Sequence, residues 1–384
     1  MLKLIFWLSL LIVLYVYLGY PLLAGLLARL RHRSVHQDDK SQPPVSILIA
    51  AYNEASDIEA TLRNKLNLNY PSGKLEILVI SDESTDGTDE LVEAVARDAR
   101  FTIRLFRQVP RQGKTAGLNT LVPEAKGEII LFSDANSQWA PDAVSKLVRN
   151  FNDPEVGYVT GKMVYVSDDG SMIGDGCSAY MKYENWLREQ ETAIGSIVGV
   201  DGGIDAMRKR LYQPLRADQL PDFVQPLKVV EQGYRVVYEP EAHLREPALN
   251  DSTSEFSMRI RVTLRALWAL KDMKALLNPA RDSLFAWQLL SHKVLRYTAF
   301  IPLAILALAS MILADSGGWY TLAFIGQLFM YGFAWLGHRR RDEQDLPAFL
   351  GVPYYFVLLN LACFQALRAY LRGEKKVIWN PRKG

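Results

Sequence analysis

Long apolar stretches lie near both ends of the chain, and the first runs from Leu4 to Ala28 with few polar interruptions. A helix needs about 20 apolar residues to cross a bilayer. A cleaved signal peptide, the alternative, has an apolar core of about 7–15 residues and a small-residue cleavage site. This stretch is longer and ends at three arginines between positions 29 and 33. It therefore predicts an uncleaved transmembrane anchor over residues 1–30, followed by a linker over residues 31–43.

Three further apolar stretches follow near the other end, within a predicted C-terminal transmembrane region over residues 293–384. Tyr297–Ala314 and Trp319–Gly337 are separated by a turn sequence and flanked on both sides by basic residues. This pattern is typical of a transmembrane hairpin with both ends in the cytosol. Phe349–Leu367 leaves two alternatives open. Its length favours a crossing, whereas the basic residues after it favour a re-entrant or interfacial segment that keeps them in the cytosol.

Between these regions, short apolar runs alternate with segments that have helical spacing. The runs predict buried strands, and the spaced segments predict helices. The predicted strands cover residues 45–50, 76–81, 102–107 and 128–133, and the predicted helices cover residues 58–66, 90–98, 115–125 and 141–151. This alternation predicts an α/β domain with a mostly parallel sheet that helices cover on both faces. We place the domain at residues 44–250, in the cytosol because of the arginines that follow the anchor.

Unusual polar residues follow the predicted strands, where ligands bind in sheets of this kind. They are Tyr52, Asn53 and Glu54 after the first strand, Asp82 after the second, and Asp134 and Asn136 after the fourth. No Gly-x-Gly-x-x-Gly follows the first strand, and no Gly-x-x-x-x-Gly-Lys-Ser/Thr occurs in the chain. The sequence therefore argues against a dinucleotide-dependent enzyme and against a P-loop NTPase.

The segment from Glu255 to Leu290 alternates basic residues with leucines and Trp268. This pattern predicts amphipathic helices on the inner membrane surface over residues 251–292, with a soluble helix packed on the domain as the alternative. The net charge of +2 and the lack of a basic tract interleaved with aromatic residues argue against a nucleic-acid partner. The two cysteines lie far apart in the sequence, which argues against a disulfide framework and a zinc site.

Several motifs, taken in their order along the chain, resemble the family 2 glycosyltransferases. These enzymes have the nucleotide-diphosphosugar transferase (GT-A) fold, with a Rossmann-like, mostly parallel sheet. The matching segments are Val45-Ser-Ile-Leu-Ile-Ala-Ala-Tyr-Asn-Glu54, Ser81-Asp-Glu-Ser-Thr-Asp-Gly-Thr88, Arg111-Gln-Gly-Lys114 with Asn119, Asp134-Ala-Asn136, and Gly202-Gly203 with Ala206 and Arg208. The flanking apolar segments are similar to those of membrane-bound members, including bacterial cellulose-synthase-like and exopolysaccharide glycosyltransferases.

The resemblance implies a nucleotide-sugar donor, with a UDP-sugar as the expected one. The donor-binding residues it implies are Ala51, Tyr52, Asn53, Glu54, Asp82, Arg111, Lys114, Asp134 and Ala135. Asp82 is expected to contact the uracil or the ribose, and Lys114 the diphosphate. The family usually has two acidic residues at the start of the nucleotide-binding turn, whereas here the first of them is Ser81.

The resemblance also implies a Mg²⁺ or Mn²⁺ cofactor, held by Asp134 and Asn136 at the position of the family's Asp-x-Asp motif. A divalent cation neutralises the charge that builds up on the departing nucleoside diphosphate. Asn136 departs from the motif because its amide is a weaker ligand than a carboxylate.

The catalytic base implied by the resemblance is Asp222. It lies at the family's spacing before Gln232-Gly-Tyr-Arg235, although Pro221 replaces the glutamate expected before it. Asp218 is the neighbouring alternative, and a helix N-cap is the structural alternative for Asp222 itself. The base would accept the proton of the acceptor hydroxyl as that oxygen attacks the anomeric carbon. The reaction would invert the anomeric centre in one displacement.

On the acceptor side, the resemblance implicates Gly202 and Gly203 in close approach to a sugar, with a plain turn as the alternative. Asp201 and Asp205 are further carboxylates in this segment. Arg261 occupies the arginine position of the Gln-x-x-Arg-Trp motif of polymerising members and is expected to contact the diphosphate or, alternatively, lipid phosphates. Met258 and Val262 replace the motif's glutamine and tryptophan, which weakens the case for a processive synthase.

These observations predict a multi-pass inner-membrane enzyme that transfers a sugar to a lipid-linked or saccharide acceptor at the cytosolic membrane face. Membrane lipid and other subunits of a polysaccharide assembly system are its further expected partners, and nucleic acid is not among them. Two alternatives remain open, a processive polysaccharide synthase subunit and a catalytically weak scaffold. A nucleotidyltransferase of related fold is disfavoured because no glycine-rich loop follows Ile49.

Overall fold

The computed structural model describes residues 1–166, 176–247, 252–341 and 346–375. The chain divides into two compact units. We call the first the sheet unit, built from His32–Met172 and Glu191–Pro247, and the second the helical unit, built from Met1–Arg31, Ile173–Gln190 and Ala248–Lys375.

The sheet unit contains one mixed sheet with the strand order β3-β2-β1-β4-β7-β6-β8-β5. The strands are β1 (Val45–Ala51), β2 (Leu75–Ser81), β3 (Thr102–Arg107), β4 (Ile129–Asp134), β5 (Gln138–Trp139), β6 (Val156–Val166), β7 (Asp205–Arg208) and β8 (Arg235–Pro247). The first four strands run parallel, as the sequence predicts. β7 is antiparallel to both β4 and β6, so the second half of the sheet is mixed.

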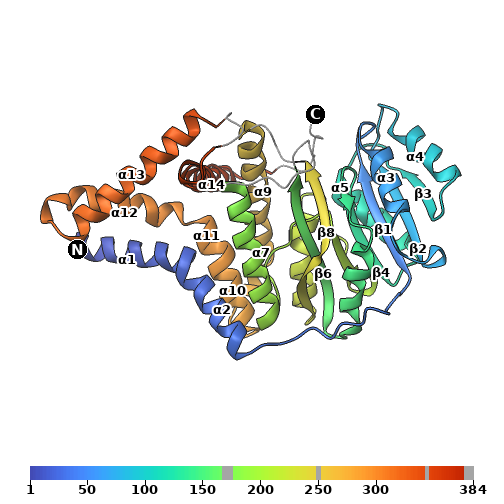
Figure 1. The fold of residues 1–384 in the computed structure, drawn as a ribbon, viewed down its shortest axis with the longest axis horizontal. Coiled ribbons are helices and arrows are strands. Elements are labelled where there is room, and N and C mark those ends of the chain that lie inside the picture. Colours follow the sequence, from blue (N-terminus) through green and yellow to red (C-terminus); the bar gives the residue numbers. More distant parts are fainter. Residues whose placement is uncertain (167–175, 248–251, 342–345, 376–384) are drawn as a thin grey trace. The chain divides into compact units, whose positions relative to one another are not determined.

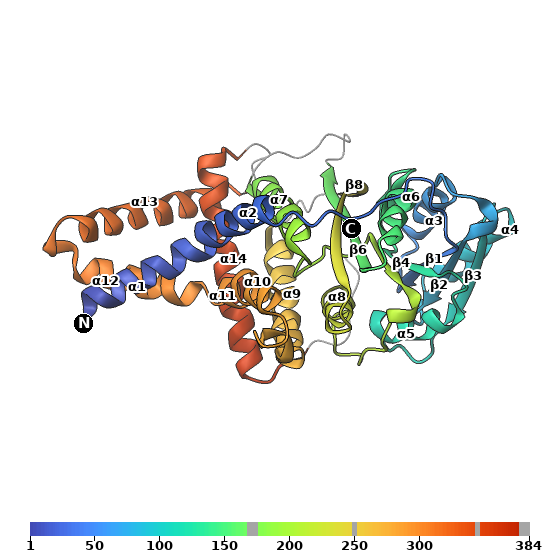
Figure 2. The same ribbon diagram turned by 90° about the horizontal axis from the view of Figure 1, so that it is seen from below.

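Helices cover both faces of the sheet, which explains why the central strands are apolar without interruption. Alternate residues of a strand point to opposite faces. In β1, Ile47 and Ile49 belong to one buried cluster, and Leu48 belongs to the other. The first cluster is closed by α3 (Ile58–Leu66), α4 (Thr88–Arg97) and α6 (Ala143–Val148), and the second by α5 (Lys114–Glu124) and α8 (Pro221–Glu231). Figure 2 shows the two helical layers on either side of the strands.

The helical unit contains the long apolar segments (Figure 1). Its α-helices are α1 (Leu2–Leu14), α2 (Tyr20–Leu30), most of α7 (Gly176–Ile194), α9 (Ser252–Asp272), α10 (Ser283–Leu289), α11 (Leu295–Tyr297), α12 (Phe300–Ile312), α13 (Trp319–Arg339) and α14 (Ala348–Leu371). Short π-helical segments at Tyr15–Gly19 and Leu290–Val294 join α1 to α2 and α10 to α11.

Two of the described helical segments are long and apolar enough to cross a membrane, Leu2–Leu30 and Ala348–Leu371. A third candidate is the pair Ser283–Tyr297 and Phe300–Ile312, which meet at a bend of 57°. A turn joins α12 to α13 where the sequence predicts one, and Gly317 and Gly318 adopt positive φ angles there. α13 is not among these candidate spans, so a crossing by this helix stays a prediction. α9 and α10 lie in the range of the predicted amphipathic helices, and their place at a membrane surface stays a prediction.

Candidate active site

The register of the sheet brings the polar residues that follow the strands to one edge. Ala51 of β1 pairs with Ser81 of β2, and Ala50 pairs with Asp134 of β4. The segments after β1, β2 and β4 therefore begin side by side at the carboxyl edge. This is the edge at which open α/β sheets bind ligands.

Asp82 holds a loop in place at this edge. Its carboxylate accepts hydrogen bonds from the backbone N–H of Gln112 (2.8 Å) and Gly113 (2.9 Å), and from the side chain of Gln108. Asp82 is 5% exposed, so these bonds satisfy a carboxylate that is almost completely removed from water. The interactions fix Gln108–Gly113 directly before α5. The sequence predicted Asp82 as a nucleotide contact, and the structure adds this loop-holding role.

Arg111 projects from the same loop over the residues that follow β1. Its guanidinium lies 3.4 Å from the ring centroid of Tyr52, a cation–π arrangement, and its Nε is 3.4 Å from Asp82 Oδ2. The backbone N–H of Arg111 donates to Glu83, which adopts a positive φ of 62°. Asn53 also has a positive φ of 52° and accepts a hydrogen bond from Thr85 N–H. The structure thus assembles Tyr52, Asp82 and Arg111 in one place.

Glu54 lies beneath this corner of the edge and is 7% exposed. Burial, followed by the nearby carboxylates of Asp57, Asp134 and Asp86, raises its pKa to about 7. Ala51 and Ala135 are buried and form part of the floor.

Lys114, the first residue of α5, connects the predicted donor and catalytic carboxylates. Its ammonium donates to Asp134 Oδ1 at 2.7 Å and lies 3.5 Å from both oxygens of Asp222. Burial alone would lower the pKa of Lys114, but Asp134 and Asp222 more than offset it and raise that pKa above its usual value. The lysine therefore stays charged, and the two carboxylates lie within reach of a single ammonium group.

Asp222 lies in the first turn of α8 rather than at its N-cap. The N-cap is Leu220, so the interpretation of Asp222 as a cap is wrong. A carboxylate in the first turn is favoured by the helix dipole. The start of α8 is tied to α5, because Thr115 Oγ1 donates to the carbonyl of Gln219 at 2.9 Å. Asp218, the alternative base, pairs instead with Arg216 at 3.1 Å.

Gly202 and Gly203 pack directly against the two carboxylates, with φ angles of 80° and 74°. A Cβ atom on Gly202 would lie 3.1 Å from the carboxyl group of Asp222, and one on Gly203 would lie 3.5 Å from Asp134 Oδ2. The turn is held by Trp139, whose Nε1 donates to the carbonyl of Gly203 at 2.8 Å. A Cβ on Gly203 would also lie 3.0 Å from Leu244 and 3.2 Å from Ser137 Oγ, so both glycines are closely packed. Their predicted approach to a sugar stays a prediction.

Asp205 is a fully buried carboxyl group beside this cluster. It lies on β7, opposite Phe132 of β4 and Thr160 of β6. Burial and the nearby carboxylate of Asp222 raise its pKa to about 8, against the opposing effect of Thr160 and Tyr158. The sequence identified Asp205 only as a carboxylate in this segment, because neither its burial nor its neighbours are visible in a local pattern.

The site offers few metal ligands of its own. Among the described residues, no three His, Cys, Asp or Glu side chains are grouped to hold a cation. A carboxylate and an amide oxygen are ligands that Mg²⁺ accepts when phosphate and water supply the rest, so the chemistry of Asp134 and Asn136 fits such a cation. A Cβ on Gly203 would lie 3.5 Å from Asp134 Oδ2, so a side chain at position 203 would crowd this carboxylate.

Several supporting residues were not predicted as site residues. Gln108 bonds Asp82, and Trp139 bonds the Gly202–Gly203 turn. Lys65 is fully buried beneath Trp139 and donates to the carbonyl of Ser137 at 2.6 Å. These contacts join residues that are far apart in the sequence, and no motif marks them. Arg261 lies on α9 in the helical unit, so the geometry of the sheet unit does not test its role.

The chain is similar in sequence to a known protein family and to several characterised proteins. The model of Glycosyl transferase family 2 matches residues 46–214. A beta-monoglucosyldiacylglycerol synthase from Trichormus variabilis is 33% identical over 194 residues, which cover 50% of this chain and 41% of that protein. A poly-beta-1,6-N-acetyl-D-glucosamine synthase from Staphylococcus aureus is 28% identical over 204 residues, which cover 52% of this chain and 48% of that protein. The chain thus spans less than half the length of these relatives.

The fold is also similar to that of a solved structure over nearly the whole chain. This is the mannosyltransferase PcManGT from Pyrobaculum calidifontis in complex with GDP-Man and Mn²⁺, with a TM-score of 0.74 and 23% identity. The likeness covers 97% of this chain and all of that one, and it shows the GT-A fold. The matched model spans the strands and loops that build the carboxyl edge, from β1 past the Gly202–Gly203 turn. Residues 46–214 of the chain therefore form a domain that is similar to the family 2 glycosyltransferases, on a GT-A fold.

Proposed function

We propose that the protein is an inverting glycosyltransferase that moves a sugar from a UDP-sugar to a lipid-linked or saccharide acceptor at the cytosolic face of the inner membrane. The observation that carries the proposal is the contact of Lys114 with both Asp134 and Asp222. It unites the carboxylate expected at the donor diphosphate with the carboxylate expected to act as base. A surface that merely kept the fold would have no need to hold these two groups together.

Asp222 acts on the acceptor. Its carboxylate accepts the proton from the acceptor hydroxyl while that oxygen attacks the anomeric carbon, and the bond to the nucleoside diphosphate breaks on the opposite side. The Gly202–Gly203 turn packs against Asp222 and adds no side chain between this carboxylate and the acceptor. A single displacement of this kind inverts the anomeric centre.

Lys114 and Arg111 act on the donor. The Lys114 ammonium stabilises the negative charge of the departing diphosphate, which is the main requirement of such a transfer. In the absence of donor it pairs with both Asp134 and Asp222, so three charged groups coexist at a half-buried site. Arg111, Tyr52 and Asp82 form the adjoining corner, where the nucleoside binds.

Asp134 and Asn136 would hold a Mg²⁺ or Mn²⁺ ion beside the donor diphosphate. When bound, the ion supplies Lewis-acid neutralisation of the leaving group. Lys114 already contacts Asp134 Oδ1 at 2.7 Å, so donor and ion binding require this ion pair to rearrange.

The acceptor class follows from two sources. The candidate membrane spans support an acceptor in an apolar phase, and the names of two relatives specify a glucosylated diacylglycerol and a polysaccharide as their products. Met258 and Val262, in place of the glutamine and tryptophan of polymerising members, favour single transfer over processive synthesis.

Nucleotide release tests the proposal. Purified protein would be supplied with a panel of UDP-sugars and GDP-mannose, with Mg²⁺ or Mn²⁺ and native lipid extract. We expect turnover with at least one UDP-sugar, and a loss of more than about 100-fold in Asp134→Ala. Asp218→Asn removes a neighbouring carboxylate outside the cluster and should retain activity. Equal activity of wild type and Asp134→Ala, or no turnover and no nucleotide binding with any donor, would contradict the proposal.

A further inference from the structure

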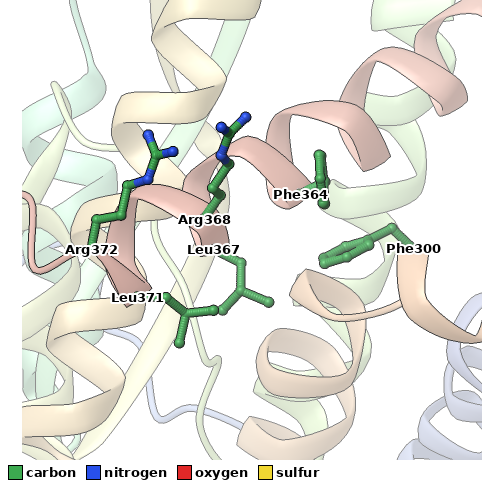
Figure 3. Close-up of a pocket in the computed structure, with 6 residues that line it drawn as sticks. All are labelled: Phe300, Phe364, Leu367, Arg368, Leu371 and Arg372. Atoms are coloured by element: carbon green, nitrogen blue, oxygen red, sulfur yellow. The ribbon is translucent and has the colours of Figure 1, made fainter.

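A pocket of about 370 Å³ lies within the helical unit, where the end of α14 faces the start of α12. Its lining consists of Phe300 from α12 and of Phe364, Leu367, Arg368, Leu371 and Arg372 from α14 (Figure 3). The α14 residues recur at spacings of three and four, so they share one face of the last turns of the helix. The Phe300 and Phe364 rings lie 5.5 Å apart and form one end of the pocket. The 57° bend before Phe300 separates α12 from the preceding helix at this point.

The pocket has one apolar edge and one basic edge. Figure 3 shows the guanidinium groups of Arg368 and Arg372 pointing together to one side of α14, with Leu367 and Leu371 on the other side. Both arginines are exposed. In the part of the chain that the structure describes, no carboxylate pairs with either guanidinium. Two like charges four residues apart on a helix repel each other. An anion bound between the two guanidinium groups would reduce this electrostatic repulsion.

The residues around the end of α14 indicate its depth in a bilayer. Trp268 of α9 packs against Tyr370 at 4.6 Å, and its Nε1 donates to the carbonyl of Glu374. Lys271 and Lys375 both lie within about 5 Å of the Trp268 ring. Tryptophan, tyrosine and lysine gather at the membrane–water interface. The arginine edge therefore lies at headgroup depth, and the phenylalanine end lies toward the hydrocarbon.

We propose that this pocket binds an anionic glycerophospholipid of the surrounding bilayer. One acyl chain lies along Phe300, Phe364 and Leu367, and the headgroup phosphate lies between Arg368 and Arg372. Guanidinium groups bind phosphate through paired hydrogen bonds, and two of them spaced one helical turn apart define a single anion position. The inference goes beyond the proposed sugar transfer and does not depend on it, because every residue that carries it belongs to the helical unit.

A diffuse attraction of basic residues to an anionic membrane is the competing explanation, and it predicts a different response to mutation. Bulk attraction depends on the number of basic residues near the surface, whichever helix carries them. A discrete site depends on the two arginines of α14 and on the empty volume beside them. Variants that remove basic residues elsewhere, or that fill the pocket while keeping both α14 arginines, therefore distinguish the two explanations.

Native mass spectrometry of the full-length protein in detergent measures the binding directly. The protein would be titrated with phosphatidylglycerol or phosphatidylcholine of the same acyl chains. We expect one phosphatidylglycerol to be retained, with an apparent affinity roughly tenfold or more above that of phosphatidylcholine. Arg368→Gln/Arg372→Gln should abolish this preference. Leu367→Trp, which fills the pocket and keeps both charges, should reduce retention of either lipid.

The matched control is Arg340→Gln/Arg341→Gln, which removes the same charge from the end of α13. It should leave the preference for phosphatidylglycerol unchanged. Equal loss in this control would identify bulk attraction and overturn the proposal, as would equal retention of the two lipids by wild type. Competition by millimolar inorganic phosphate would show that the site takes a soluble anion, and would also overturn it. Each variant would first be checked for the wild-type melting temperature, and Leu367→Trp keeps the test decisive if the double arginine variant is unstable.

Discussion

Asp205, a single buried residue beside the site, makes the stability of the fold depend on pH. It is fully buried and keeps its proton up to about pH 8 in the folded protein, whereas an unfolded aspartate loses its proton near pH 4. Between these values the unfolded state binds fewer protons than the folded state. Folding stability therefore falls as pH rises through this window, by at most about 1.4 kcal/mol per pH unit for this group. The contribution of protonated Asp205 to folding stability is complete below pH 4 and is lost as pH approaches 8.

The first prediction concerns this pH dependence. The melting temperature of the wild type should fall between pH 5 and pH 8, and Asp205→Asn should flatten that fall because an amide does not ionise. Glu54→Gln provides a comparison, because Glu54 also has a raised pKa, about 7, and contributes a decline of the same sign. Thermal unfolding in detergent at four pH values would measure both effects. A wild-type curve that rises toward pH 8, or an unchanged slope in Asp205→Asn, would contradict the prediction.

The second prediction concerns the contact between a glycine and the proposed base. Gly202→Ala places a methyl group 3.1 Å from the Asp222 carboxyl carbon and also strains a residue with a φ of 80°. Gly233→Ala creates the same strain at a φ of 86°, but its methyl group meets no atom within 4 Å. Each strain costs roughly 1–2 kcal/mol of stability. Turnover should fall about tenfold or more only in Gly202→Ala. Equal turnover in the two variants would show that the contact with Asp222 has no catalytic role.

At the residue scale, the sequence predicted the members of the site better than their contacts. Lys114, Asp134 and Asp222 lie together in the structure, and Asp82 lies beside Arg111, whereas the roles of these residues stay predictions. The motifs did not reveal that Lys114 pairs with both acidic residues, because the ion pairs join segments up to 108 residues apart. The role of Asn136 stays a prediction.

At the scale of elements, one buried carboxylate holds the conformation of the loop Gln108–Gly113. Asp82 accepts from two backbone N–H groups of this loop and from Gln108, and hydrogen bonds to a charged acceptor are the stronger kind. The loop leads directly into Lys114. The order of this loop therefore determines the positions of Arg111 and Lys114, for which we propose a role in donor binding.

The third prediction follows from this dependence. In the absence of nucleotide, Asp82→Asn should increase hydrogen exchange at the backbone N–H groups of Gln112 and Gly113 by roughly tenfold or more, because an amide is a weaker acceptor than a carboxylate. Asp98→Asn, at the end of α4, makes the same change away from the loop and should leave that exchange unaltered. Unchanged exchange in Asp82→Asn would show that the carboxylate does not hold the loop.

The helices and strands differ in how well a local sequence pattern predicts them. β1 to β4 and the helices between them were predicted closely. β1, β2 and β4 are short, apolar and almost completely buried runs, whereas β3 lies at the edge of the sheet and is only partly buried. β6, β7 and β8 were not predicted. They pair partly antiparallel across long separations, and that pairing leaves no local period in the sequence. α6 is also shorter than predicted and continues as a 3₁₀ turn at Arg149–Asn152.

At the scale of the whole molecule, the chain combines a sheet unit with the site and a helical unit with the candidate membrane spans. The helical unit buries charged groups as well as apolar ones. Arg296 pairs with Glu184 at 2.5 Å, and His292 lies 3.2 Å from the same carboxylate. Hydropathy predicts apolar helices from the sequence, but it does not predict such pairs or the bend before α12, because both depend on packing between helices.

The fourth prediction concerns the side of the membrane on which the sheet unit lies. The arginines at positions 29, 31 and 33 predict that it lies in the cytosol. Ser56 is exposed on the sheet unit, so Ser56→Cys, in a background with both native cysteines replaced, supplies a single accessible thiol. A membrane-impermeant maleimide should label it in inverted membrane vesicles and in lysed cells, and leave it unlabelled in intact spheroplasts. Labelling in intact spheroplasts would contradict the orientation.

The central claim, that Asp222 is the base of a sugar transfer, is tested most directly by measuring donor affinity and turnover together in Asp222→Asn. Lys114 keeps its contact with Asp134 in this variant, so the donor site remains intact. We predict donor affinity within about threefold of wild type and turnover reduced by about 10²–10⁴-fold. Turnover close to that of wild type would contradict the account.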